Sequence, residues 1–228
     1  MPGTALSLPP LPAGLMALPG VYRPQPDTLL LAEALDQEEL GPQSDVLEIG
    51  TGTGALALQA AATGARVMAV DVSWPAVVTA RLNSLRRRLP LRVLHGDFAA
   101  RTAGRRFDLV VANPPYVPAP EVRLPSHGPQ RAWDAGPDGR AVLDRICGRA
   151  PALLRPGGVL LLVHSQMCRA EETLESLARV GLAAEVTAKV SVPWGPVLRS
   201  RRSWLEQRGL AAEAQEWEEL VIIRARPA

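Results

Sequence analysis

The tetrapeptide Asn113-Pro114-Pro115-Tyr116 is the most specific chemical feature of this 228-residue sequence. Two consecutive prolines restrict the backbone and carry no N–H donor, so nearby carbonyl groups are free to accept hydrogen bonds. The side-chain oxygen of Asn113 and the carbonyl of Pro114 can accept both hydrogens of a planar amino group, while Tyr116 can stack on a flat substrate. We expect a site that orients the nitrogen of a planar amino group, such as an amide or an exocyclic nucleobase amine, for attack without a general base.

A second motif is the glycine-rich turn Glu48-Ile49-Gly50-Thr51-Gly52-Thr53-Gly54, which follows an apolar segment. Its glycines allow a ligand to approach the backbone closely. Glu48 would repel a pyrophosphate, so the turn suits a ligand with a cationic amino-acid end, such as S-adenosylmethionine. Asp71 is placed to accept hydrogen bonds from both ribose hydroxyls, and Asp97 from the adenine amino group.

Secondary structure must position these motifs, and the apolar runs predict strands that alternate with helices. Strands are expected at residues 46–49, 66–70, 91–94, 107–112, 159–163, 182–190 and 219–224. Helices are expected at residues 28–40 with Asp27 as N-cap, 54–62, 73–88, 139–154 (ended by Arg155-Pro156-Gly157-Gly158) and 169–180. This order predicts an α/β fold with a doubly wound, mostly parallel sheet, which binds ligands at the carboxyl ends of its strands.

Three segments fall outside this alternation. Residues 1–26 are rich in proline and are expected to form an N-terminal strap, ahead of a single domain at residues 27–228. Residues 113–135 form a proline-rich loop of a length that is usually functional, with Pro115, His127 and Trp133 on the expected substrate side. Residues 193–215 are expected to be an elaborated connection before the last strand.

Composition excludes several classes of protein. Cys147 and Cys168 are the only cysteines, and with three histidines the sequence predicts no metal site. No apolar run is long enough to span a bilayer, so we expect a cytoplasmic protein without membrane contact. The net charge is +2, and Lys189 is the only lysine, so the arginine clusters reflect compositional bias. Nucleic acid is therefore a possible but not a favoured partner.

The motifs together resemble class I S-adenosylmethionine-dependent methyltransferases of the HemK (PrmC) family. The resemblance rests on residues 21–28, 48–54, 113–117, 126–128, 132–133 and 139–140. It is strongest to the short branch that methylates the glutamine of the Gly-Gly-Gln motif in release factors. It implies a Rossmann-like seven-stranded sheet with an antiparallel last strand. It also implies cofactor contacts from Thr28, Glu48, Gly50, Asp71, Asp97 and Phe98, and catalytic positioning by Asn113, Pro114 and Tyr116. We expect Gly52 and Asn113 to border the cofactor as well.

The leading hypothesis is therefore N-methylation of a glutamine side-chain amide in a protein, with a translation factor as the expected substrate. An alternative is methylation of an exocyclic amine of adenine or guanine in RNA or DNA, because the same clamp presents nucleobase amines. A second alternative is a cofactor-binding subunit without catalytic activity. The resemblance also makes a small activator subunit a possible partner.

Overall fold

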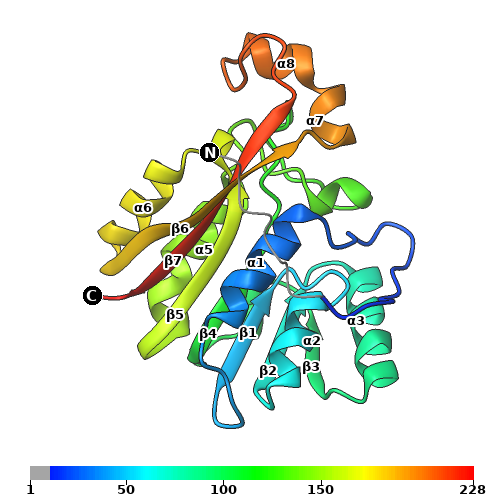
Figure 1. Cartoon of the computed structure of the whole chain (residues 1–228), viewed down its shortest axis with the longest axis vertical. Coiled ribbons are helices and arrows are strands. Elements are labelled where there is room, and N and C mark those ends of the chain that lie inside the picture. The colour runs from blue at the N-terminus through cyan, green and yellow to red at the C-terminus, as the bar shows by residue number, and fades with distance from the viewer. Residues whose placement is uncertain (1–10) are drawn as a thin grey trace, which may run out of the picture.

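The protein contains one seven-stranded mixed sheet (Figure 1), seen here in a computed structural model that describes residues 11–228. The strand order is β3-β2-β1-β4-β5-β7-β6. Strands β1 to β5 run parallel, and β7 is antiparallel to both of its neighbours. The predicted fold class and antiparallel last strand are confirmed. The strands span Asp45–Ile49 (β1), Arg66–Asp71 (β2), Leu91–His95 (β3), Phe107–Ala112 (β4), Leu154–Ser165 (β5), Leu182–Pro193 (β6) and Trp217–Pro227 (β7).

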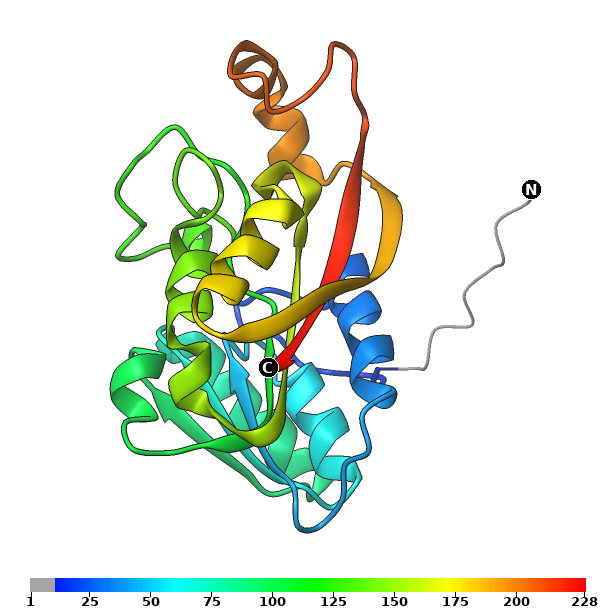
Figure 2. The same ribbon diagram turned by 90° about the vertical axis from the view of Figure 1, so that its left-hand side faces the viewer.

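Helices cover both faces of the sheet (Figures 1 and 2). Each face of the sheet forms a separate apolar core with its helices. One face carries α1 (Pro26–Asp36), α2 (Ala55–Ala62) and α3 (Trp74–Arg87). The other carries α4 (Phe98–Arg101), α5 (Ala141–Leu153) and α6 (Ala170–Arg179). Because both faces are covered, the central strands are continuous apolar runs. Among the helices described, none has the length and apolar character of a membrane span.

The start of α1 corrects the expectation that Asp27 caps this helix. Gln25 is the N-cap, and Pro26 begins the helix with its fixed backbone angle. Asp27 therefore lies inside the first turn, where its side chain is buried. The helix also ends at Asp36 rather than at residue 40.

Strand β5 begins earlier than predicted, because Arg155-Pro156-Gly157-Gly158 does not separate a helix from a strand. Leu154 pairs with Phe107 and Val159 with Leu109, so the four residues between them form a bulge within β5. A Cβ atom at Gly158 would lie 2.9 Å from the Phe107 carbonyl oxygen, which explains the glycine. The sequence signal for a chain break is here a signal for a bulge.

Residues 11–25 of the predicted strap contain no helix or strand and lie along α3; residues 1–10 are outside the described part. The buried Asn83 of α3 accepts a hydrogen bond from Met16 N (3.0 Å) and donates one to Met16 O (2.9 Å). These paired bonds align the segment so that residues 20–25 reach the carboxyl end of the sheet.

The 193–215 segment contains two short helices, α7 (Pro196–Ser200) and α8 (Arg202–Gln207), which project beyond the sheet (Figure 2). Buried Trp194 packs with Leu198 and Leu205 in a small separate core. Arg201 ties this segment to the 113–135 loop, through an ion pair with Asp134 (2.6 Å) and a hydrogen bond to Pro118 O (2.8 Å).

Gly54, at the start of α2, tests how closely the glycine turn packs against α3. Its φ is +80°, and a Cβ atom there would lie 3.1 Å from Ala80 Cβ. Gly54→Ala should lower the free energy of unfolding by at least about 1 kcal/mol, because a left-handed L-residue is strained. Gly148→Ala is the control, since Gly148 lies within α5 with open space around it. It should stabilise the protein by about 0.5–1 kcal/mol in the same urea titration. Equal effects would contradict this account of the turn.

Candidate active site

A cavity of about 380 Å³ opens at the carboxyl ends of β1, β2 and β4. The strand order reverses between β1 and β4, which is where doubly wound sheets form ligand sites. The cavity brings together most of the predicted site residues, namely Thr28, Glu48, Gly50, Gly52, Asp71, Asn113, Pro114, Pro115, Tyr116 and Trp133.

Glu48 contributes a buried carboxyl group to the lining of this cavity. Its Oε2 atom accepts hydrogen bonds from the Thr51 hydroxyl and from Ala57 N at 3.2 Å. Burial nevertheless raises the pKa of Glu48 to about 8, and the nearby Asp71 adds to the rise. A cation bound beside it would favour the ionised form, so the site is suited to a positively charged ligand.

The glycine turn places Asp71 against the same cavity. Gly50 N donates to Val70 O at 2.8 Å, which holds the turn against β2. The Asp71 carboxyl accepts hydrogen bonds from Gly52 N (3.0 Å) and Ser73 N (2.8 Å). Burial raises its pKa despite these two donors. Each oxygen still has lone pairs for a ligand hydroxyl.

Asp27 connects three segments of the chain that line the cavity. Its Oδ2 atom accepts hydrogen bonds from the Tyr22 hydroxyl (2.8 Å) and the Tyr116 hydroxyl (3.0 Å). Its Oδ1 atom accepts from Thr28 N (2.6 Å) and from the Thr28 hydroxyl (3.1 Å). Burial raises the pKa of both tyrosines, so their hydroxyls stay protonated and donate. With four donors directed at it, Asp27 acts only as an acceptor.

This network determines how the Asn113 amide is oriented. The Thr28 hydroxyl hydrogen points to Asp27, so the Thr28 oxygen can accept a hydrogen bond. Asn113 Nδ2 donates to it at 3.3 Å. The Asn113 side-chain oxygen is then directed away from Thr28 and is available in the cavity. That orientation is compatible with the acceptor role that the Asn-Pro-Pro-Tyr motif predicts, and the role itself stays a prediction.

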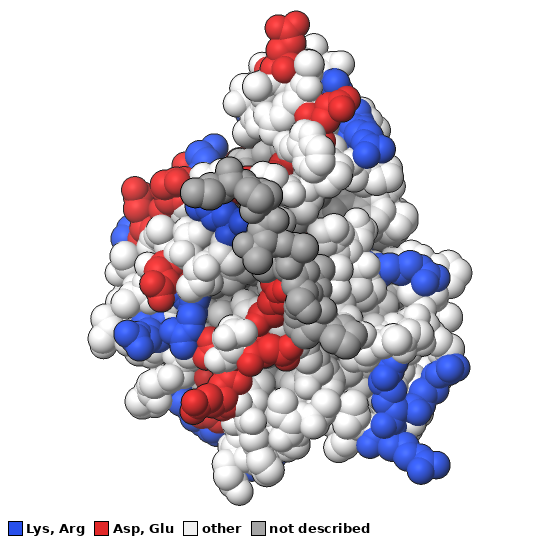
Figure 3. Space-filling model, viewed as in Figure 1, with Lys and Arg blue, Asp and Glu red and all other residues white. Residues whose placement is uncertain are grey.

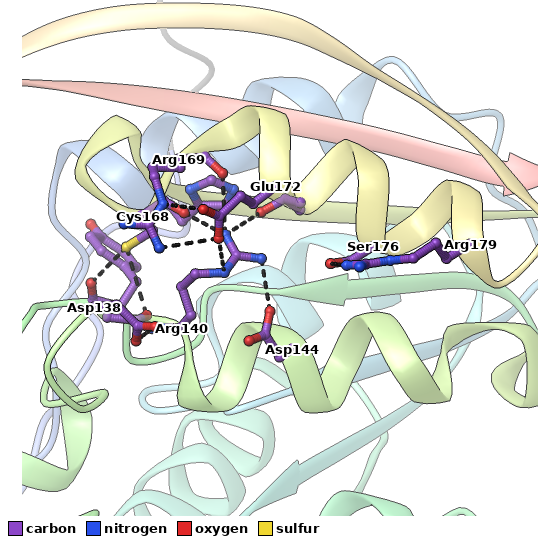
Figure 4. A network of polar contacts seen from close by, with 12 residues as sticks. Asp138, Arg140, Asp144, Cys168, Arg169, Glu172, Ser176 and Arg179 are labelled. Carbon is purple, nitrogen blue, oxygen red and sulfur yellow. Dashed lines mark hydrogen bonds and ion pairs between the residues drawn. The ribbon is translucent and has the colours of Figure 1, made fainter. Parts of the chain in front are cut away.

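A second polar network, which includes Arg140 and Cys168, supports the loop that contains Tyr116 (Figure 4). Cys168 Sγ donates to the Tyr116 carbonyl at 3.0 Å. The buried guanidinium of Arg140 donates to the carbonyls of Cys168 and Arg169 and pairs with Asp144 at 2.7 Å. A Cβ atom at Gly139 would lie 2.4 Å from the Tyr116 carbonyl oxygen, so only glycine fits there. These contacts fix the backbone at Tyr116.

Three predicted site residues lie outside the cavity lining found in the described chain. Asp97 caps α4 by accepting from Ala99 N and Ala100 N, and it pairs with Arg145 at 2.5 Å. Its partial burial is outweighed by Arg145, so its pKa is lowered. Phe98 follows it, with Arg145 stacked over its ring at 5.4 Å. Exposed His127 bonds to the Ser126 hydroxyl. Their contacts with ligands stay predictions.

The cavity also contains residues that the sequence interpretation did not assign to the site, including Tyr22, Asp27 and Glu218. Tyr22 and Asp27 lie in the segment that carried the family resemblance, which was a usable signal. Glu218 gave none, because the last strand was expected to begin one residue later.

Comparison with known proteins agrees with this geometry. The family description "methyltransferase small domain" matches residues 14–124. A putative protein N5-glutamine methyltransferase of Methanocaldococcus jannaschii is 33% identical over 177 residues, which cover 77% of this chain and 88% of that protein. The chain belongs to the HemK family of methyltransferases. Methyltransferase HEMK2 of Homo sapiens is 35% identical over 178 residues, which cover 74% of this chain and 83% of that protein.

Bacterial relatives of this HemK-family chain are longer. The release factor glutamine methyltransferase of Moorella thermoacetica is 40% identical over 154 residues, but the match spans only 54% of its length. Among solved structures, the E. cuniculi Mtq2–Trm112 complex, which methylates the termination factor eRF1, has a TM-score of 0.63 at 22% identity and covers 92% of this chain and 99% of that one. The T. thermophilus 16S rRNA methyltransferase RsmC, with AdoMet and guanosine, has a TM-score of 0.62 at 29% identity. The match covers 93% of this chain and 46% of that one.

The raised pKa of Glu48 makes the stability of this HemK-family protein depend on pH. The folded state holds the Glu48 proton from pH 4.5, its ordinary pKa, to about 8, so stability falls as pH rises through that range. Glu48→Gln has no charge to bury. The free energy of unfolding of Glu48→Gln minus that of wild type should therefore increase between pH 5 and pH 8, by up to about 1.4 kcal/mol per pH unit. Urea titrations measure this. Glu175→Gln, on the exposed surface of α6, is the control. A constant difference between Glu48→Gln and wild type would refute the assigned burial cost.

Proposed function

We propose that this protein transfers a methyl group from S-adenosylmethionine to the side-chain nitrogen of a glutamine in a protein, with a release factor as the substrate. The orientation of Asn113 carries this proposal, because a free amide oxygen beside Pro114 suits a neutral NH₂ group. The names of the relatives support the substrate, since they include release factor glutamine methyltransferases.

The cavity residues fit S-adenosylmethionine as the cofactor. Glu48 offers a carboxyl group to the cationic amino-acid end, and the left-handed glycines leave room beside it. Asp71 offers acceptors to the ribose hydroxyls. When bound, the cofactor supplies an electrophilic methyl group.

The residues around Asn113 contribute orientation. We expect the Asn113 side-chain oxygen and the Pro114 carbonyl to accept the two hydrogens of the substrate amide. An amide lone pair is delocalised, so holding both hydrogens directs the nitrogen toward the methyl group. Orientation of this kind can lower a barrier by about 7–11 kcal/mol. The polar network through Thr28 and Asp27 fixes the oxygen before substrate binds, so little entropy is lost on binding.

Methylation of a nucleobase amine is the second candidate, favoured by the likeness to RsmC. On the face shown in Figure 3, however, basic and acidic side chains form separate small groups rather than one basic surface. Nucleic-acid binding depends chiefly on phosphate contacts from such a surface. Among the described residues, the face in Figure 3 therefore presents no continuous basic surface for phosphate contacts.

A protein partner is also part of the proposal, since Mtq2 is assembled with Trm112. Helix α3 has an exposed apolar stripe formed by Trp74, Val78, Leu82 and Leu85. It lies beside β3, the edge strand of the sheet. An exposed apolar face next to an open strand edge is a suitable surface for a small activator subunit.

The proposed function predicts where methyl label will appear. Incubated with labelled S-adenosylmethionine and a ribosome-containing extract, the purified protein should label a polypeptide, and exhaustive digestion with peptidases should release labelled N-methylglutamine. The label should be lost on protease treatment and survive nuclease treatment. Label that survives protease but is lost to nuclease would instead support nucleobase methylation. Asn113→Ala is the control and should bind the cofactor normally while losing turnover.

The orientation of Asn113 predicts a difference between two variants of Thr28. Thr28→Val removes the hydroxyl that holds Asn113 Nδ2, whereas Thr28→Ser keeps it. The valine variant should lose kcat by roughly tenfold, the worth of one buried hydrogen bond. The serine variant should retain most of the rate.

Steady-state kinetics with a purified release factor measure this difference, and calorimetry with S-adenosylmethionine checks that both variants still bind the cofactor. Equal kcat values in the two variants would show that the hydroxyl does not position Asn113.

A further inference from the structure

Glu218 is a carboxyl group in the cavity wall that the proposed methyl transfer does not use. It lies at the start of β7, where it pairs with Val192 of β6. Side chains alternate along this strand: Glu218 and Leu220 line the cavity, whereas Glu219 between them pairs with Lys189 at 3.3 Å. Pro193, Pro196 and Val197 continue the wall beside Glu218. This wall belongs to the C-terminal strands and the elaborated segment between them.

One carboxyl oxygen of Glu218 lacks a hydrogen-bond donor within the described part of the chain. Its Oε2 atom is enclosed and has no hydrogen-bond partner among residues 11–228. Burial raises the pKa of Glu218 to about 7, against the effect of the Ser165 hydroxyl. The ionisable groups that face it are Asp27 from α1, Tyr22 before α1, and Tyr116 and Cys168 from the loops after β4 and β5. None of these groups is basic.

A buried carboxyl oxygen without a donor destabilises a folded protein, because desolvation is not compensated. The two prolines in the adjacent wall have no N–H group to offer. The missing donor is therefore expected to come from a ligand, toward which the carboxyl group must turn because its Oε2 atom is enclosed. With Asp27 nearby, this end of the cavity carries two acidic groups, which would repel a phosphodiester and attract N–H donors.

We propose that Glu218 is a substrate-recognition residue that accepts a hydrogen bond from an N–H group of the polypeptide carrying the methyl acceptor. Its negative charge also selects against nucleic acid at this end of the cavity. This assignment rests on the proposed function, and it adds a residue on β7 that distinguishes polypeptide from polynucleotide.

Glu218→Gln tests the assignment, with Glu219→Gln as the matched control on the opposite side of the strand. With a purified peptide chain release factor and saturating S-adenosylmethionine at pH 8, Glu218→Gln should raise the KM for the release factor about tenfold, the difference between a charged and a neutral acceptor. The kcat should change little, because the Asn113 clamp is intact. Glu219→Gln should match wild type in both constants.

The pH dependence separates recognition from a structural role. The wild-type KM should rise as pH falls from 8 to 6, because protonation removes the acceptor charge, while the Glu218→Gln KM should stay flat. Saturating cofactor keeps the titration of Glu48 from contributing. Glu218→Gln should also raise the Tm at pH 8, because it removes an unpaired buried charge; a lowered Tm would indicate a structural role and overturn the assignment.

The two proposals fail differently. If wild type methylates the release factor and Glu218→Gln behaves like Glu219→Gln, the recognition role is wrong and the proposed function stands. If wild type does not methylate the release factor but labels nucleic acid, both proposals are wrong.

Discussion

The carboxyl group of Asp27 is the interaction on which the active-site geometry depends. It is buried and receives hydrogen bonds from Tyr22, Thr28 and Tyr116, which come from the N-terminal segment, α1 and the loop after β4. Burial of a polar group is unfavourable unless it is well hydrogen-bonded, so these segments are held in one arrangement. Through Thr28, the same carboxyl group determines which atom of Asn113 faces the cavity. Loss of this one acceptor would affect the cavity wall and the Asn113 clamp together.

The Asn-Pro-Pro-Tyr loop is held by contacts with several other segments of the chain. Asp27 binds the Tyr116 hydroxyl, while Cys168 binds the Tyr116 carbonyl and is itself positioned by Arg140. Arg201 adds a third support, because it forms an ion pair with Asp134. Asp134 in turn forms a β-bridge with Val117, the residue after Tyr116. A substrate amide must be oriented within a fraction of an ångström for efficient transfer, and a proline-rich loop alone does not provide that precision.

Local sequence signals predicted the sheet and the motifs at its strand ends, because strand patterning and glycine turns depend on neighbouring residues. They failed where distant contacts decide. Asp27 is of a residue type that often caps helices, but its side chain is buried, where it accepts a hydrogen bond from Tyr116, 89 residues away. The Arg155–Gly158 sequence indicates a turn, yet its pairing with β4 makes it a bulge. Glu218 belongs to β7 because β6 and β7 pair for two to three residues beyond their predicted ends at this side, and no local pattern encodes that extension.

The acidic residues of the cavity differ in what surrounds them, and this difference separates structure from function. Asp27 has four donors within the chain, so its burial is compensated. Glu48 and Glu218 have fewer, and burial raises their pKa values to about 8 and about 7. Each would be more stable as a neutral group, and a fold selected for stability alone would not retain them. Both line one cavity, in agreement with the proposals that Glu48 faces a cation and that Glu218 accepts a hydrogen bond from an N–H donor. The stability that these two carboxyl groups forfeit is then recovered when both ligands are bound.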